Sequence, residues 1–331
     1  MIRSLVTSAE ANENEAPKVS RNLELDRLEV AITDGRLMWI DVVDPETSEI
    51  HWLSDQFHLN PAVVQDLMRY DRRPALLVYP DYLFLSLFEP HINLSRVEGR
   101  EIHCLITDTC FITVRPSDAT AVDNAYKRVT QNPDAWESGV AYCFYLTAQY
   151  VTDSYYPLLD RISNQLNTVE EKLLNGGADE QARKPVYRIK QQLINLRQIV
   201  APQREVFSNV LGEKRLTESG NIRDLFRHLY ERLLRVYDVI DSQRDLSSNV
   251  LDMLQNQESS KLVEGVNRLT IFSMIFLPLT FFTSFFELNF VTTFDPLVLP
   301  VNGGILFMFV VGAMMLSATL MVYMFRRRGW L

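Results

Sequence analysis

Residues 269–286 read LTIFSMIFLPLTFFTSFF, eighteen residues without a single charged side chain. This length and polarity are typical of a helix that crosses the hydrocarbon core of a membrane. A second apolar run of similar length, residues 303–324, follows after a short connection. A buried core helix would explain either run alone, but two runs close together, neither with a polar face, favour two membrane spans. We therefore predict transmembrane helices over residues 269–286 and 303–325.

The charges beside these spans predict their orientation. Lys261 and Arg268 precede the first span, residues 326–328 are three arginines after the second, and the connection 287–302 contains no Lys or Arg. Cytoplasmic segments carry the excess of Lys and Arg, so both termini of this multi-pass protein should lie in the cytoplasm. Residues 287–302 then form a loop on the opposite side of the membrane, and residues 326–331 form a basic cytoplasmic C-terminus.

The N-terminal part of the chain reads as a mixed α/β domain over residues 19–118. Short apolar or alternating runs, separated by turn signals such as Pro90, predict a small sheet, and helical spacing over residues 47–68 predicts one helix among the strands. Residues 1–18 are polar and acidic, without the apolar run of a signal peptide, and predict a disordered tail. We expect strands at residues 36–43, 76–78, 82–88, 101–106 and 110–114.

Strand signals end after residue 118, and the rest of the chain before the spans predicts helices. Residues 119–220 form a helical region with an antiparallel pair, residues 140–174 and 179–211, separated by the helix stop Asn175-Gly176-Gly177. Residues 221–268 contain no proline and predict a long stalk helix that runs directly into the first span. The predicted fold class is an α/β cytoplasmic domain followed by long helices and two C-terminal transmembrane helices.

Composition excludes several classes of function. The net charge of -9 argues against a nucleic-acid partner, since phosphate binding needs clustered Lys and Arg, and it suits a protein that attracts cations. The three cysteines form no CxxC pair, which indicates reduced thiols and no thiolate zinc site. Neither a P-loop nor a Gly-x-Ser-x-Gly or His-x-x-x-His motif is present, so the sequence predicts neither an enzyme nor an ATP-driven pump, and no cofactor.

One seam of the long helix carries polar side chains at heptad spacing. Its members recur every seven residues, and three more positions lie beside them on the same face. The seam comprises Asp252, Ser259, Val266, Ser273, Thr280 and Glu287, and the neighbouring positions are Leu269, Leu277 and Ser284.

Two interpretations of this seam remain open. The hydroxyl groups of Ser273, Thr280 and Ser284 can bond back to the backbone of their own helix. Alternatively, they line a water-filled path, with carboxylates at both ends and apolar constrictions at Leu269 and Leu277, as in cation channels. Two helices cannot enclose such a path, so the second interpretation requires several chains around one axis.

The residues around this seam resemble a known family. The run TIFSMIFLPLTFFTSFFELNF (270–290) resembles the first transmembrane helix and signature of the CorA superfamily of divalent metal cation transporters (CorA/ZntB-like), and FRRRGWL (325–331) is similar to its basic ending. The resemblance extends over nearly the whole chain. Further similar blocks are WIDVVDPE (39–46), YPDYLFLSLFE (79–89), LRQIVAPQREVF (196–207) and VYDVIDSQRDLSSNVLD (236–252).

The resemblance implies a funnel-shaped homopentamer in the lipid bilayer of the inner membrane that carries magnesium, cobalt, nickel or zinc. It also implies that residues 287–302 form a short periplasmic loop. It implies that Asn289 holds a hydrated ion at the entrance and that Asp252 is an acidic position near the inner end of the pore. The family's Gly-Met-Asn signature is altered here to Glu-Leu-Asn, residues 287–289. His228 stands where magnesium-gated members carry an inter-subunit Asp, and with Glu231 it is the candidate regulatory metal site.

The transported ion is not fixed by these residues. Magnesium is handled best through its water shell by neutral oxygens, which favours it as the first choice for this path. Zinc and nickel prefer imidazole and thiolate, and no histidine lies in a span. The alternatives are a proton-coupled zinc transporter and a non-conducting, metal-sensing membrane scaffold. His91, His103 and His228 are either metal sensors or ordinary histidines.

Overall fold

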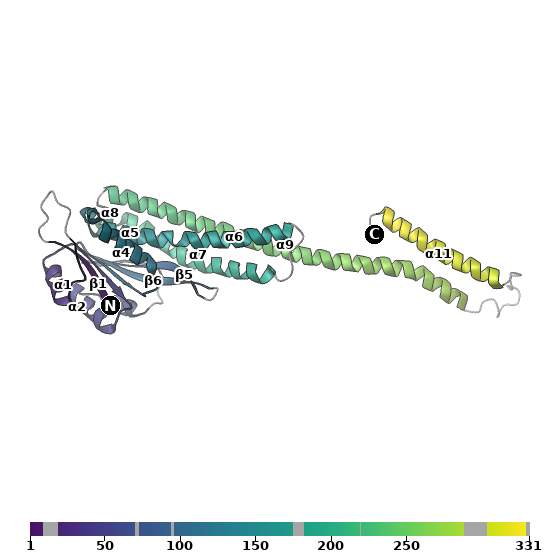
Figure 1. Ribbon diagram of the computed structural model, residues 1–331, viewed down its shortest axis with the longest axis horizontal. Coiled ribbons are helices and arrows are strands. Elements are labelled where there is room, and N and C mark those ends of the chain that lie inside the picture. Colours follow the sequence, from purple (N-terminus) through teal and green to yellow (C-terminus); the bar gives the residue numbers. More distant parts are fainter. Residues whose placement is uncertain are drawn as a thin grey trace. The chain divides into compact units, whose positions relative to one another are not determined.

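The computed structural model of the chain describes residues 1–8, 19–69, 73–93, 96–174, 182–218, 220–287 and 303–328. It divides into two compact units, Met1–Leu251 and Asp252–Leu331 (Figure 1). The first holds the sheet and most of the helices, and the second holds the membrane-length helices.

In the described part of the first unit, seven strands form one mixed sheet in the order β2-β1-β3-β7-β6-β5-β4. Strands β3 and β7 run parallel, and all other neighbouring strands run antiparallel. The strands are β1 Ile2–Thr7, β2 Val19–Arg21, β3 Met38–Val43, β4 Leu76–Val78, β5 Leu83–Asn93, β6 Arg96–Ile106 and β7 Cys110–Arg115. The five predicted strands are therefore confirmed.

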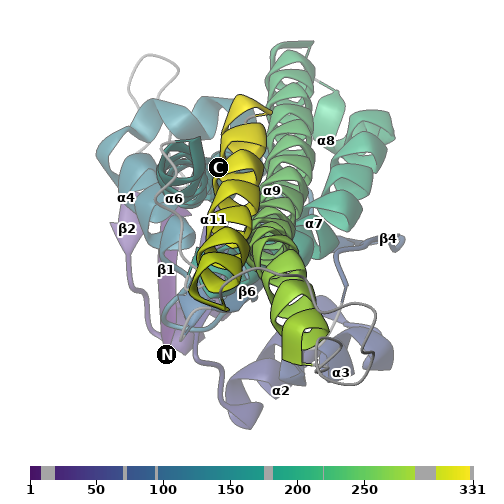
Figure 2. The same ribbon diagram turned by 90° about the vertical axis from the view of Figure 1, so that its right-hand side faces the viewer.

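Helices cover both faces of this sheet (Figures 1 and 2). On one face, α1 Leu25–Thr33, α2 Thr47–Phe57 and α3 Pro61–Met68 bury a core that includes Ile40 and Ile112. The other face is covered by the helices that follow β7. These are α4 Thr120–Gln131, the 3-10 helix η1 Pro133–Ser138, α5 Gly139–Asp153, α6 Tyr155–Leu174, α7 Arg183–Gly212 and α8 Lys214–Thr217.

The prediction of a disordered tail over residues 1–18 is wrong for its first residues. Ile2–Thr7 forms β1, which pairs with β2 on one edge and β3 on the other. Leu5 and Val6 are at most 1% exposed, so this short strand contributes to the core. Residues 1–18 as a whole are polar and acidic, and this composition hid the apolar pair Leu5 and Val6 that β1 buries.

Two predicted helices are each divided in two. The helix expected over residues 47–68 breaks after α2, where His58 has a left-handed φ of 47°, and α3 restarts at Pro61 with Asn60 accepting a hydrogen bond from the amide of Ala62. The helix expected over residues 140–174 breaks at Ser154, between α5 and α6. The helices on either side of each break bury apolar residues that continue one helical spacing in the sequence. The spacing alone therefore does not show the break.

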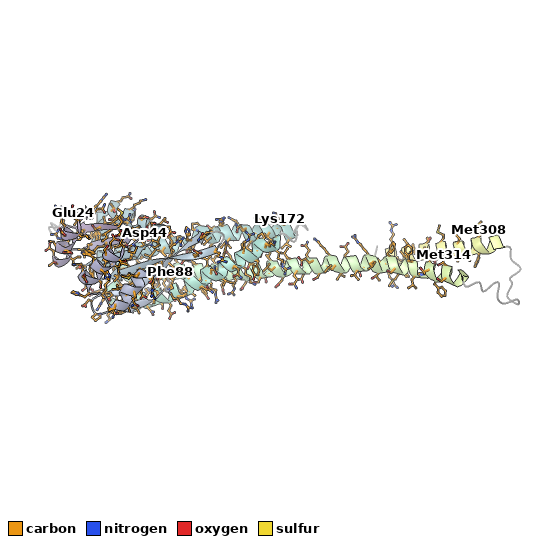
Figure 3. The ribbon with its side chains drawn as sticks, turned by 90° about the horizontal axis from the view of Figure 1, so that it is seen from below. Glu24, Asp44, Phe88, Lys172, Met308 and Met314 are labelled. Atoms are coloured by element: carbon orange, nitrogen blue, oxygen red, sulfur yellow. The ribbon has the colours of Figure 1, made fainter. Side chains whose placement is uncertain are left out.

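Pro90 was predicted to end a strand but lies inside β5, opposite Gly99. Strand β4 pairs only with Leu83 to Leu85 of β5, so in the described sheet β4 does not reach Pro90. The lack of an N–H at Pro90 therefore breaks no hydrogen bond to β4. Helices complete this open edge instead. At Phe88 (Figure 3), the amide donates to Gln203 Oε1 at 2.8 Å and the carbonyl accepts from Tyr155 Oη at 2.7 Å.

The helix α9, Gly220–Glu287, is 68 residues long and continuous from the first unit into the second. The predicted stalk and the predicted first span are therefore one helix. In the second unit α11, Gly303–Arg327, follows it and runs back in the opposite direction (Figure 1). Both helices are long and apolar enough to cross a membrane.

Candidate ion path and metal sites

The polar seam predicted from heptad spacing lies on an exposed face of α9 in the second unit. Seven residues are close to two helical turns, so the seam positions stack along one side. Leu269 and Leu277 are 67% and 72% exposed, whereas Ile271, which points elsewhere on the helix, is 7% exposed. This large apolar face, interrupted by hydroxyl groups, is left uncovered by the described residues of the second unit.

Within this face a shallow groove gathers the central part of the seam. It is lined by Ser273, Phe276, Leu277, Thr280, Phe281 and Ser284. All six residues come from α9, and four of them were predicted to line a path. The structure therefore brings Ser273, Leu277, Thr280 and Ser284 together on one surface, and adds two phenylalanines that the heptad pattern did not single out.

The hydroxyl of Thr280 follows the first of the two interpretations, because it donates to the carbonyl of Phe276 at 2.9 Å. This bond does not remove the residue from a cation path. A hydroxyl that donates its proton to the backbone still presents oxygen lone pairs as acceptors. Such an acceptor suits the water shell of a cation or the cation itself.

Pro278 adds a polar group that the sequence prediction missed. Its nitrogen has no hydrogen, so Pro278 cannot donate the hydrogen bond that the carbonyl of Met274, four residues earlier, would accept in a regular α-helix. Met274 is next to Ser273 of the seam. The signal was present in the sequence as a proline in the middle of an apolar run.

The two ends of the predicted path differ in what the structure describes. Asp252 and Ser259 are exposed on α9, at the beginning of the second unit. Glu287 is the last residue of α9, but its side chain and the whole of Asn289 lie outside the described residues. The predicted entrance site therefore remains a prediction.

The candidate regulatory pair lies on α9 in the first unit. His228 Nδ1 is 3.7 Å from Glu231 Oε2, and the two side chains are 73% and 54% exposed. One imidazole and one carboxylate are two ligands, and a bound metal ion commonly has more. Across the described residues no group of three or more His, Cys, Asp or Glu side chains is placed to hold a metal ion. A single chain therefore supplies at most two ligands, fewer than a metal site commonly has.

The other predicted sensor in the interior, His103, has local partners. Its Nδ1 lies 3.1 Å from Ser86 Oγ and 3.7 Å from Glu101 Oε1, and its ring stacks on Phe84. The side chain is fully buried, so it packs in the core and is not open to metal from solvent.

The three cysteines do not supply metal ligands. Burial raises the pKa of Cys104, Cys110 and Cys143 far above the usual value for a thiol, so all three stay protonated. Metals bind the thiolate form.

Known proteins resemble the chain over most of its length. The sequence model described as "CorA-like Mg2+ transporter protein" matches residues 34–327. The chain is 25% identical over 304 residues to the cobalt/magnesium transport protein CorA of Thermotoga maritima, covering 88% of this chain and 83% of that protein. It is 24% identical over 257 residues to the zinc transport protein ZntB of Pectobacterium carotovorum, covering 76% of each.

Solved structures show the same fold. The complete structure of the CorA magnesium transporter from Methanocaldococcus jannaschii superimposes with a TM-score of 0.82 at 20% identity, covering 100% of this chain and 99% of that one. Its soluble domain alone superimposes with a TM-score of 0.61 at 19% identity, covering 76% of this chain and 95% of that one.

Proposed function

Because this chain belongs to the CorA-like Mg²⁺ transporter family, we propose that it carries divalent metal cations across a membrane along the exposed face of α9. One observation supports the path above all others. The groove at Ser273, Leu277, Thr280 and Ser284 presents hydroxyl oxygens on a face that the described part of the second unit leaves uncovered. A lipid-facing helix has no need of such a row, and polar groups inside a membrane usually face a bundle interior or a water-filled cavity.

The path is formed by several copies of the chain. The described part of the second unit contains only two helices, which cannot surround a column of water. A ring of copies places the exposed face of every α9 against a common axis, and a closed homopentamer is the assembly implied by the family resemblance. Cross-linking of Ser273→Cys between copies tests this assembly, and failure to cross-link at Ser273 and at Thr280 would contradict it.

The protein sits in the inner membrane with both termini in the cytoplasm. Arg326 and Arg327 end α11, and Lys261 and Arg268 lie before the first span, so the positive charges are all on one side. The first unit is then cytoplasmic, and the connection 287–302 forms the outer mouth.

Magnesium is the preferred substrate, with cobalt, nickel and zinc as alternatives. Along the described part of α9 within the span the polar groups are hydroxyl and carbonyl oxygens, which handle a hydrated hard cation better than a soft one. An influx assay in liposomes with a metal-sensitive dye, run for the four metals with and without a pH gradient, tests this assignment. Influx that requires a pH gradient and is selective for zinc would replace it with proton-coupled zinc transport.

A further inference from the structure

A second groove lies in the first unit, between α6 and α7. Its volume is about 450 Å³, within the range of small-molecule sites, and Ile92 near the end of β5 closes one side. Lys172, labelled in Figure 3, marks the end of α6 that is nearest the α6–α7 connection. The floor is apolar, since Leu158, Ile162 and Ile189 are each at most 7% exposed.

Two arginines stand on the walls of this groove, Arg161 on α6 and Arg188 on α7. No aspartate or glutamate is among the described residues that line it. Neither guanidinium forms an ion pair with any described residue. The two arginines belong to α6 and α7, which pack against each other. Two like charges with no counter-charge therefore share one small groove, and an anion placed between them would be attracted by both.

Arginines in another groove of the first unit are arranged differently. Arg197 of α7 and Arg244 of α9 line a larger groove of about 860 Å³, but both contact the same oxygen, Oδ1 of Asp241, at 3.3 Å and 3.0 Å. Arg244 also pairs with Asp245. The larger groove also holds Arg73 and the carboxylate of Glu98, so carboxylates of the chain lie beside its arginines, whereas none is among the described residues that line the groove at Arg161 and Arg188.

We propose that the α6–α7 groove binds a single-chain anionic amphiphile, namely a free medium-chain fatty acid. The carboxylate would lie between Arg161 and Arg188, because guanidinium groups bind carboxylates through paired, charge-assisted hydrogen bonds. The hydrocarbon chain would cover the floor at Leu158, Ile162 and Ile189, which removes apolar surface from water. The volume lies near the lower end of the small-molecule range, which favours one short chain over a two-chain lipid.

The test uses the full chain in lipid nanodiscs and a photoreactive decanoic acid, with the labelled peptides mapped by mass spectrometry. Labelling of α6 and α7 peptides is expected, and excess decanoate should compete whereas the neutral decanol should not. Labelling of the membrane helices serves as the internal reference for probe dissolved in lipid. The assay reports binding alone, so it is independent of whether the chain conducts metal ions.

The variant Arg161→Gln/Arg188→Gln should lower α6 and α7 labelling by at least about tenfold, the loss expected when charge-assisted hydrogen bonds are removed. The charge-retaining variant Arg161→Lys/Arg188→Lys should keep part of it. Arg223→Gln is the matched control, because this exposed arginine on α9 lies outside the groove and forms no ion pair with a described residue.

Four results would overturn the proposal. The first is labelling confined to the membrane helices, and the second is equal competition by decanol and decanoate. The third is unchanged labelling in the double glutamine variant. If the α6 and α7 peptides of the wild type instead cross-link to an acidic segment of a second copy, the groove is an interface between copies and the fatty-acid site is wrong.

Discussion

Arg115 holds Asp41 at two points in the interior of the sheet domain, with Nε 3.1 Å from Oδ1 and Nη2 3.1 Å from Oδ2. Both side chains are at most 1% exposed. Thr113 Oγ1 donates to the same carboxylate at 2.7 Å, and Arg3 of β1 also binds it. Asp123 of α4 contacts both guanidinium groups, so two carboxylates balance two arginines and connect β1, β3, β7 and α4.

The first prediction concerns this buried network. Asp41→Asn leaves the buried Arg115 and the partly exposed Arg3 with one carboxylate between them, and removing one partner of a buried pair costs about 3–5 kcal/mol. We expect a clearly lower thermal unfolding midpoint for the sheet domain. Asp123→Asn is the control, since Asp123 is 30% exposed and solvent can replace part of its interaction. Equal midpoints for the two variants would show that burial does not set the strength of this network.

A second prediction is a pH dependence that arises from Glu89. This carboxylate, 7% exposed, accepts hydrogen bonds from Thr120 Oγ1 and the amide of Ala121, both at 3.0 Å, at the start of α4. Burial raises the pKa of Glu89 above its ordinary value despite these bonds. The folded state then binds more protons than the unfolded state between the two pKa values, so stability falls as the pH rises through that window.

Glu89→Gln removes this titration. Thermal midpoints of wild type and Glu89→Gln, measured from acidic to neutral pH, should therefore differ by an amount that changes in that window and is constant above it. Asp44→Asn provides a control of opposite sign, because hydrogen bonds from Ser117 lower the pKa of Asp44 and make its contribution increase with pH. A pH-independent difference between wild type and Glu89→Gln would contradict the prediction.

Much of the fold was predictable because strands and helices each have a characteristic spacing of apolar residues, and membrane spans have a characteristic length of uncharged sequence. The breaks were harder, since His58 and Ser154 interrupt helices whose apolar pattern continues on both sides. Pro90 stays in a strand only because β4 ends before reaching it, a tertiary fact absent from local sequence. The Asp41–Arg115 pair joins residues 74 positions apart, and neither side chain has a local signal that identifies its partner.

The ion path was predictable in part for a related reason. Heptad spacing alone places Ser273, Leu277, Thr280 and Ser284 on one face, because helix geometry converts spacing into direction. The roles of Glu287 and Asn289 depend on residues 288–302, which follow α9, carry no periodicity in the sequence and lie outside the described residues.

The third prediction concerns that outer mouth, where a ring of Glu287 carboxylates would concentrate cations. Glu287→Gln should lower metal influx at low ionic strength and lose much of this defect in high salt, since salt screens such fields over about 10 Å at 0.1 M. Asn289→Ala should impair influx at both salt concentrations, because it removes an ion contact. Equal influx for wild type and Glu287→Gln across the salt range would make Glu287 a solvated carboxylate at the helix end.

The fourth prediction concerns gating by cytoplasmic metal. His228 and Glu231 supply two ligands on each chain, so a complete site would need ligands from a neighbouring copy. Chelation of cytoplasmic metal should increase the fraction of channels that are open. Channels of the double variant His228→Ala/Glu231→Gln should be open with or without metal. Identical influx of the wild type with chelator and with millimolar metal would remove this site from the mechanism.

The central claim, that divalent cations pass along the exposed face of α9, is tested most directly by thiol block of influx in liposomes. The native cysteines are buried and protonated, so they should not react with a methanethiosulfonate reagent. Magnesium influx through Ser273→Cys should fall to background after modification. Influx through Ile275→Cys, whose side chain points to the opposite side of the helix, should persist. Full influx through a completely modified Ser273→Cys protein would contradict the account.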